Sequence, residues 1–397
     1  MNGASTPLPP LALYLHFPWC VRKCPYCDFN SHALRDALPE EPYIDALLAD
    51  IGAQAPLVAG REVQSIFLGG GTPSLFTPDA LGALFAGLRR QLVVAADAEV
   101  TLEANPATVE RGRFAEYHAA GINRVSLGAQ SFDGATLQRL GRIHQPADVW
   151  RAAQELHASG LANFNLDLMY GLPEQTLAGA VADVTAALAL EPAHVSHYQL
   201  TLEPGTLFAA RPPPLPDEDL AWAMQLESQA LLAARGYGQY EVSAYARAGR
   251  QCRHNVNYWQ FGDYLGAGAG AHGKLTRLDG AAPALRIGRS THLREPRRYF
   301  GSAGQGPAWR DVAQEDLSFE FMMNALRLTE GFAPELLAHR TGLLLDGLAP
   351  ALARLEEEGL LDSGAGRWRP SARGFQYLNE VVARFLPERI SQTVARS

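Results

Sequence analysis

The 397-residue sequence has few cysteines, no excess of basic residues and no long apolar run. Its four cysteines, three of them in one short loop, do not form a disulfide framework, which favours a reducing compartment. Acidic residues outnumber Lys and Arg by 42 to 34, so no overall basic field is present to attract nucleic acid. No stretch reaches the roughly 18 apolar residues of a spanning helix, and the N-terminus lacks the pattern of a signal peptide. We therefore expect a cytoplasmic protein.

The composition is that of a globular protein with enough apolar material for a core. Hydrophobic residues make up 47% of the chain and charged residues 19%. A chain of this length usually folds into two or three domains.

Short apolar segments alternate with longer helical patterns from residue 11 to about residue 205. Such a series predicts parallel strands joined by right-handed crossovers, in either a doubly wound open sheet or a partial barrel. The expected strands are 11–17, 65–70, 99–105, 124–130, 163–171 and 194–201.

Distinctive polar residues follow several of these strands. In both architectures a ligand binds at the carboxyl ends of the strands, so we expect these residues to converge there. They are the three clustered cysteines, the run Gly69–Thr72, Glu103, Asn105, Gln130 and Asp167.

The sequence pattern changes twice in the rest of the chain. A Pro-rich acidic stretch at 210–220 reads as a linker, and a Gly-rich loop follows at 262–275. From about residue 315 the pattern is helix, turn, two short strands and helix, which predicts a winged-helix-like module. That module carries 13 acidic and 9 basic residues, the wrong sign for docking on nucleic acid. We expect domains at 1–210, 211–310 and 311–397.

Cys20, Cys24 and Cys27 form the pattern C-x-x-x-C-x-x-C directly after the first expected strand. Three thiolates suit a cubane iron–sulfur cluster that leaves one iron without a protein ligand. A zinc site would need one further ligand, for which His16, Asp28 or His32 is near in sequence.

The cysteine motif, with Tyr26 before its last cysteine, resembles that of the radical S-adenosylmethionine (SAM) superfamily. Together with the strand-end residues, it is similar to the oxygen-independent coproporphyrinogen III oxidase group. The resemblance implies a partial (β/α)6 TIM-type barrel followed by a small C-terminal α+β module, and a 4Fe–4S cluster that binds SAM. The SAM contacts it implies are Tyr14, Tyr26, Gly70, Gly71, Thr72, Glu103, Gln130, Arg142, Asp167, Gln199 and His272.

Two features separate branches within this group. The oxidases resemble C-x-x-x-C-x-x-C-x-C, but here Phe29 stands where they have the fourth cysteine. The segment "CRHNVNYWQF" matches the H-N-x-x-Y-W mark of the HemW branch, the heme chaperones. Imidazole is the commonest protein ligand to heme iron, although a histidine among aromatic residues is by itself more often structural. The resemblance implies heme contacts at His254, Asn255, Tyr258 and Trp259, with Cys252 as a competing iron ligand.

By this resemblance, the protein binds heme and delivers it to respiratory-chain heme proteins at the membrane, with any contact to the inner membrane peripheral. The alternative is an enzyme, a coproporphyrinogen III oxidase that uses radical-SAM oxidative decarboxylation. We assign no catalytic residue. The sequence leaves open whether SAM is cleaved and whether the chain forms a homodimer.

Overall fold

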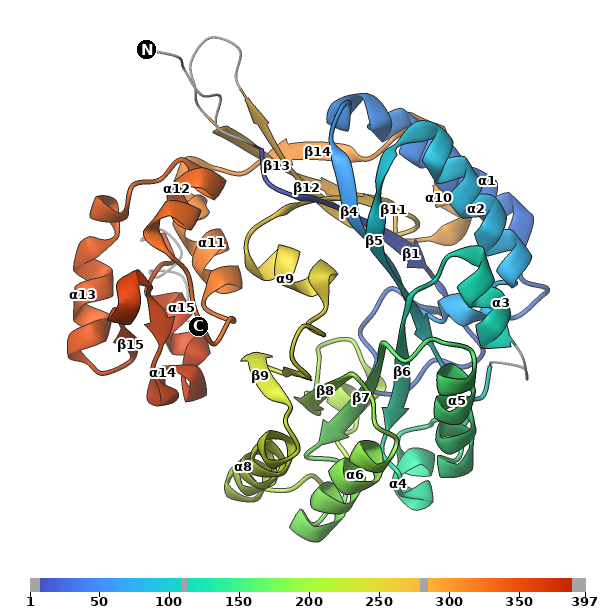
Figure 1. Cartoon of the computed structure of the whole chain (residues 1–397), viewed down its shortest axis with the longest axis horizontal. Helices are drawn as coiled ribbons and strands as arrows, with labels where there is room; N and C mark the ends of the chain where they lie inside the picture. Colours follow the sequence, from blue (N-terminus) through green and yellow to red (C-terminus); the bar gives the residue numbers. More distant parts are fainter. Residues whose placement is uncertain (1–7, 109–112, 279–284, 388–397) are drawn as a thin grey trace.

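The computed structural model describes residues 8–108, 113–278 and 285–387. Its centre is one curved sheet of 12 strands in the order β14-β13-β12-β11-β1-β4-β5-β6-β7-β8-β10-β9. The two edges do not pair with each other, so the sheet is an open, partial barrel rather than a closed one. Figure 1 shows the sheet curving around a concave inner side.

The six strands expected from the sequence form the middle of this sheet. Each pairs in parallel with its neighbour, which confirms the predicted series of parallel strands. They are β1 (Leu11–Phe17), β4 (Glu62–Gly70), β5 (Val93–Ala104), β6 (Arg124–Gln130), β7 (Phe164–Tyr170) and β8 (His194–Gln199).

Side chains alternate between the two faces of these strands. On β1, Leu13 and Leu15 belong to the main apolar core, whereas Tyr14 and His16 point to the inner side. The same alternation along β5 to β8 places apolar residues outward and polar residues inward. The barrel therefore has an apolar outer layer under its helices and a polar interior.

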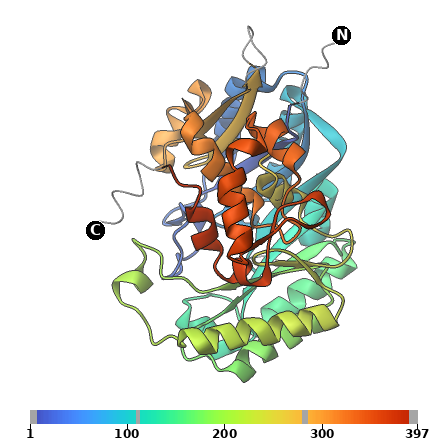
Figure 2. The same ribbon diagram turned by 90° about the vertical axis from the view of Figure 1, so that its left-hand side faces the viewer.

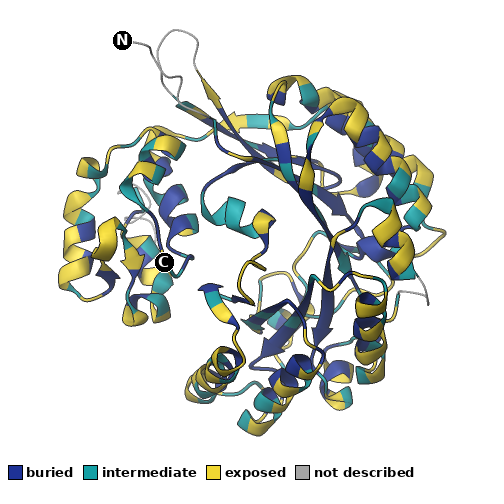
Figure 3. Cartoon of the chain, in the orientation of Figure 1, coloured by how far each residue is buried: buried dark blue, intermediate teal, exposed yellow. Residues whose placement is uncertain are grey.

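Helices cover the outer face of the sheet (Figure 1), with their exposed sides turned to solvent (Figure 3). The Thr77 hydroxyl caps the start of α2 by accepting from the Ala80 N–H at 3.2 Å. These helices are α1 (Glu40–Gln54), α2 (Pro78–Gln91), α3 (Arg113–Ala120), α4 (Gly134–Arg139), α5 (Pro146–Ala158), α6 (Leu177–Ala189) and α8 (Glu218–Ala234).

Residues after the sixth parallel strand extend the sheet at both edges. Next to β8 lie β10 (Ala244–Ala246) and β9 (Gly238–Glu241); next to β1 lies β11 (Asp263–Ala267), which is parallel to it. The antiparallel strands β12 (His272–Leu278), β13 (Leu285–Thr291) and β14 (Ala308–Asp311) follow. Between these two additions, α9 (Arg253–Trp259) crosses the concave side of the sheet.

The C-terminal module lies across the open side of the sheet from the outer helices, in front of it in Figure 2. Its own apolar cluster includes Phe261 and Ile287 from the barrel extension, so the module packs on the barrel. The expected hairpin is present as two short antiparallel strands. The module contains α11 (Leu317–Ala325), α12 (Pro334–Thr341), α13 (Ala349–Glu357), β15 (Leu361–Asp362), β16 (Arg369–Pro370), α14 (Ala372–Gln376) and α15 (Leu378–Ala383). The domain boundaries given above stay a prediction.

A buried ion-pair network joins β11 to its neighbours. Asp263 is fully buried; its carboxylate accepts from the Lys274 ammonium at 3.0 Å and from the Arg61 guanidinium at 2.8 Å. The Thr276 hydroxyl donates to the same carboxylate at 2.8 Å. Burial lowers the pKa of Lys274 to about 8, so this lysine depends on Asp263 to stay charged.

We predict that Asp263→Asn destabilises the protein by about 3–5 kcal/mol, because it leaves a buried ammonium without its counter-charge. The matched control is Asp311→Asn, whose carboxylate is half exposed and pairs with Arg277 on the surface; this change should cost less than about 1 kcal/mol. Urea denaturation measures both, and equal losses would contradict the assignment.

Candidate functional site

A cavity of about 150 Å³ lies at the carboxyl ends of the parallel strands. It is the place where the strand-end residues were expected to meet, and most of them do line it. The sequence-predicted residues in its wall are Cys20, Cys24, Tyr26, Cys27, Gly70, Gly71, Thr72, Glu103, Asn105, Gln130, Arg142 and Asp167.

The cysteine loop is held at its base by a small parallel pair, β2 (Trp19–Cys20) and β3 (His32–Ala33). Inside the loop, the Cys27 N–H donates to the Cys24 carbonyl at 3.2 Å. The Arg142 guanidinium reaches across from the segment after α4 and lies 3.7 Å from the Cys24 sulfur. A cation beside the thiols offsets the negative charge that thiolates would bring into this partly buried loop.

The donor set fits a 4Fe–4S cluster. Among the described residues, no three His, Cys, Asp or Glu side chains are grouped so that they could hold a single metal ion. A cubane makes a different demand, because each of three thiolates binds its own iron. Burial raises the pKa of Cys20 and of Cys27, so binding a cluster would release protons from these thiols.

Gly70 brings bare backbone to the cavity. Its φ of 109° lies in the region that favours glycine, and a Cβ there would meet the His16 ring at 2.4 Å. Its N–H donates to the Glu103 carboxylate at 3.0 Å. The glycine therefore lets the end of β4 pass close to both His16 and Glu103.

Glu103 and Asp167 place two carboxyl groups in the same wall. Burial and the nearby Asp167 raise the pKa of Glu103 to about 8, and burial raises the pKa of Asp167 as well. A cavity wall with two buried carboxyl groups suits a cationic ligand or one with hydroxyl donors, which would favour their ionised form.

Gln130 ends β6 in a left-handed conformation, with a φ of 65°. Such a conformation is costly for a residue with a side chain and is held by its surroundings. The Tyr198 hydroxyl donates to the Gln130 side-chain oxygen at 2.8 Å, which fixes the amide in the cavity wall.

Sequence reasoning missed part of the wall, above all Ser126, Gly128 and Tyr198. The signal was available: once Gln130 is assigned to the inner side of β6, alternation places Gly128 and Ser126 there too. On β8 the same rule favours Tyr198 over the predicted Gln199, which is exposed and outside this wall.

Tyr14 and His272 also lie outside the wall of this cavity. Tyr14 stands behind it on β1, where burial and the Glu103 charge raise the pKa of its phenol; its hydroxyl is 3.0 Å from His16 Nδ1. His272 is exposed at the start of β12. Their SAM contacts, like the other assigned contacts, stay predictions.

The cysteine loop is tied to the Gly-rich loop between β11 and β12. The Asn30 side-chain amide donates to the carbonyls of Ala269 and Arg294, both at 2.8 Å. The Asn30 carbonyl in turn lies 2.8 Å from His16 Nε2. A displacement of one loop would therefore disturb the other.

Helix α9 carries the H-N-x-x-Y-W segment and turns its residues to three sides. His254 faces β4, where its Nδ1 lies 3.1 Å from the Ser65 hydroxyl and its Nε2 lies 2.9 Å from the Tyr258 hydroxyl. Burial lowers the pKa of His254 to about 3, so the imidazole is neutral, the form that binds iron. In this conformation both ring nitrogens have partners, so an iron bond at either one would replace a hydrogen bond.

Trp259 and Cys252, at the two ends of α9, make contacts of their own. Trp259 packs under the Arg327 guanidinium, 4.3 Å from the ring centre, and its Nε1 has no hydrogen-bond partner among the described residues. The Cys252 sulfur is fully buried 3.5 Å from a Glu99 carboxylate oxygen, and burial raises the pKa of this thiol to about 12. Cys252 is therefore a protonated thiol, a poor iron ligand as it stands.

Comparison with known proteins agrees with the geometry. The family model of the radical SAM superfamily matches residues 14–184, and that of the HemN C-terminal domain matches residues 312–377. The sequence is 50% identical to heme chaperone HemW of Escherichia coli, over 96% of this chain and 99% of the relative. The chain belongs to the HemW family.

Two further matches, one to a relative and one to a solved structure, agree with this assignment. HemW of Bacillus subtilis is 33% identical over 94% of this chain and 99% of its own. The structure of coproporphyrinogen III oxidase (HemN) from E. coli superposes with a TM-score of 0.79 at 25% identity, over 96% of this chain and 91% of that one. This chain thus shares the fold of HemN.

For this HemW family member, we predict that Glu103→Gln stabilises the apoprotein at alkaline pH. Glu103 has a raised pKa, so its contribution is fully present below its ordinary pKa and is lost as pH rises towards 8. The glutamine cannot ionise, and the variant should exceed the wild type by on the order of 2–4 kcal/mol at pH 8.

The gain should shrink towards zero near pH 5, and urea denaturation at several pH values measures it. Glu116→Gln, on the exposed side of α3, is the control and should change little. A gain that is the same at every pH would mean that the Glu103 carboxyl does not titrate in this range.

Proposed function

We propose that this protein is a heme chaperone that holds a 4Fe–4S cluster on Cys20, Cys24 and Cys27, binds SAM beside it, and delivers heme to membrane respiratory enzymes. The observation that carries the proposal is the match over nearly the whole chain to proteins named heme chaperones. The cavity at the strand ends supports the cluster and SAM, since the three cysteines, Glu103 and Asp167 line it together.

The rival function is oxidative decarboxylation of coproporphyrinogen III, which the fold shared with HemN favours. The second residue after the cysteine motif argues against it. Phe29 lines the cavity with 58% of its surface exposed, and its ring offers no thiol where the oxidase motif has one.

An anaerobic assay separates the two functions. The protein with a reconstituted cluster is incubated with SAM, a reductant and coproporphyrinogen III, and protoporphyrinogen is measured; heme is titrated in parallel through its Soret band. We expect heme binding without product. Product formed over repeated turnovers would overturn the chaperone proposal.

The cavity and α9 are joined through the barrel interior. The Asn165 amide donates to Asp167 at 2.8 Å, and its oxygen lies 2.7 Å from His194 Nδ1. His194 Nε2 is 2.9 Å from the Tyr240 hydroxyl, which accepts from the N–H of Cys252, the residue before α9, at 3.3 Å. A bound cluster supplies electrons and an open iron; the chain itself supplies this continuous polar path from the cavity to α9.

We therefore predict that the triple variant with Ala at Cys20, Cys24 and Cys27 impairs heme transfer more than heme binding. If the cavity biases α9 through the polar path, transfer should slow by about 5–150-fold, the usual range of coupling between sites. Transfer is followed by mixing heme-loaded protein with an apo heme-protein acceptor, and binding by Soret titration. Unchanged transfer in the triple variant would reject the coupling.

Delivery at the membrane requires an encounter at its surface. Across the part of the chain that the structure describes, no helix combines the length and apolarity needed to span a bilayer. We propose that the protein is cytoplasmic and meets heme-accepting respiratory proteins peripherally. A homodimer is compatible with this proposal, and sedimentation of the heme-free and heme-loaded protein tests it.

A further inference from the structure

Two polar side chains reach the sulfur atoms of the cysteine motif. The Arg142 guanidinium lies 3.7 Å from the Cys24 sulfur, and the Ser31 hydroxyl lies 3.8 Å from the Cys27 sulfur. Arg142 also donates to the Gly128 carbonyl at 2.9 Å, so this side chain helps to hold the cavity wall as well. Ser31, which is not among the residues expected from the sequence, has no such second role for its hydroxyl.

The backbone of Ser31 is fixed by the cysteine loop itself. Its N–H donates to the Phe29 carbonyl at 2.7 Å, and its carbonyl accepts from the Lys23 ammonium at 3.2 Å. The residue is 5% exposed and lines the cavity. Because these contacts use only the backbone, the side-chain hydroxyl is left to face the Cys27 sulfur.

The same hydroxyl acts on a second cysteine. Burial raises the pKa of Cys20 and of Cys27, and hydrogen bonding to Ser31 opposes that rise at both thiols. A donor that opposes the rise stabilises the thiolate, which is the form of cysteine that binds iron. Ser31 is therefore within reach of two of the three proposed cluster ligands.

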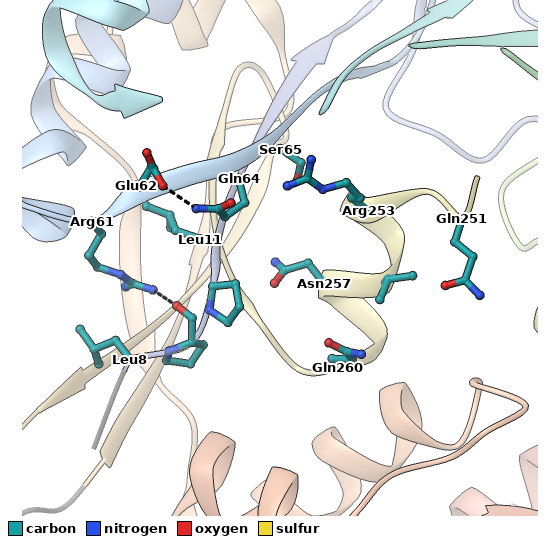
Figure 4. Close-up of a pocket in the computed structure, with 13 residues that line it drawn as sticks. Leu8, Leu11, Arg61, Glu62, Gln64, Ser65, Gln251, Arg253, Asn257 and Gln260 are labelled. Carbon is teal, nitrogen blue, oxygen red and sulfur yellow. Dashed lines mark hydrogen bonds between the residues drawn. The ribbon is translucent and has the colours of Figure 1, made fainter. Parts of the chain in front are cut away.

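The fourth cysteine has the opposite surroundings. The Cys252 sulfur lies 3.5 Å from a carboxylate oxygen of Glu99, an acceptor that would repel a thiolate. Its chain neighbours Gln251 and Arg253 line a cavity of about 710 Å³ beside α9 (Figure 4), and no cysteine is among the described residues of that wall. Donors thus face the thiols of the motif, whereas the remaining thiol faces an acceptor.

Binding of a cluster would fix the direction of the Ser31 hydrogen bond. Between a free thiol and a hydroxyl, either the Ser31 oxygen or the Cys27 sulfur can be the donor. A thiolate on iron has no proton, so the hydroxyl must donate and the sulfur must accept. Donation draws negative charge from the sulfur and favours the reduced cluster, which carries one electron more.

Resting on the proposed 4Fe–4S cluster, we infer that the Ser31 hydroxyl donates to the Cys27 thiolate and raises the reduction potential of the cluster. The electron comes from an external reductant such as dithionite, and no bond of the protein is formed or broken. Transfer of that electron to SAM would break a carbon–sulfur bond and give methionine and a 5′-deoxyadenosyl radical. A higher potential retains the electron, so Ser31 is a positioning residue that favours SAM binding over SAM cleavage.

Redox titration of the full-length protein with a reconstituted cluster, followed by electron paramagnetic resonance, measures the potential. In Ser31→Ala the one-electron equilibrium should move about tenfold towards the oxidised cluster, which corresponds to about 59 mV. Ser31→Thr keeps a hydroxyl and should restore the wild-type potential. The matched control is Ser228→Ala, since Ser228 is fully buried on α8 and lies outside the cavity. A wild-type potential in Ser31→Ala would reject the inference.

A second measurement separates the hydrogen bond from a change in the shape of the loop. Electron–nuclear double resonance detects protons that couple to the reduced cluster and that exchange in D₂O. One exchangeable coupling of the wild type should be lost in Ser31→Ala and kept in Ser228→Ala. Equal spectra of the wild type and Ser31→Ala, or a wild type without any exchangeable coupling, would overturn the assignment.

Cleavage of SAM tests the consequence of the hydrogen bond. Protein that has been reduced beforehand is mixed with SAM, and 5′-deoxyadenosine is measured over a single turnover. Ser31→Ala should form it faster than the wild type, by up to about tenfold, because its cluster holds the electron less tightly. An equal or slower rate would reject the role of Ser31 in favouring SAM binding.

The outcomes distinguish this inference from the function on which it rests. Iron and sulfide analysis shows whether each protein holds the cluster, and circular dichroism shows whether it is folded. A folded wild type that assembles no cluster would reject the proposed cluster and this inference with it. An assembled cluster with the same potential and the same exchangeable couplings in Ser31→Ala would reject this inference and leave the proposed function standing.

Discussion

The polar inner face of the half barrel is the constraint on which both sites depend. A barrel interior can be filled with apolar layers, but here β5 to β8 turn Glu99, Arg124, Asn165, Asp167 and His194 inward. Buried polar groups are costly unless each finds a partner, so these side chains must hold a particular arrangement. Arg124 lies near Glu99 and Asp167 and supplies the positive charge that balances them. The fixed arrangement positions the cavity wall and the start of α9 together.

This network gives the two ends of the barrel a physical connection. At one end it terminates in Asp167, in the wall beside the cysteines; at the other, the Glu99 carboxylate accepts from the His254 N–H at 3.2 Å. A second connection runs along β1 from Asn30 through His16 to Tyr14, whose ring lies 6.4 Å from that of His254. A ligand at one end that changes the charge of a residue in this hydrogen-bonded network would act on the other end through it. Glu103 and Asp167 are the residues of this network whose charge a ligand would change most readily, because burial already raises the pKa of each.

Much of the architecture and most of the cysteine site were readable from the sequence. Strand–helix alternation gave all six parallel strands, and the rule that parallel strands end at one edge brought the cysteines, Glu103, Gln130 and Asp167 together. The sequence did not predict the contacts between residues that are far apart along the chain. Pairing of β11 with β1 joins residues about 250 positions apart, and no local pattern predicts it. The same holds for Asn30, whose partners Ala269 and Arg294 lie far along the chain.

The α9 segment shows why a motif and a binding surface need not coincide. The motif H-N-x-x-Y-W directs attention to its polar and aromatic positions, yet residues that are neighbours in a helix point to different sides. His254 and Tyr258 are four residues apart and bond to each other, which makes them a structural pair in the conformation described. A chaperone must also release its cargo. A histidine that gives up a hydrogen bond when it binds iron regains that hydrogen bond when the heme leaves. Heme would therefore be held less tightly than by a histidine that has no such partner. If His254 binds the heme iron as proposed, its contact with Ser65 would favour transfer over permanent retention.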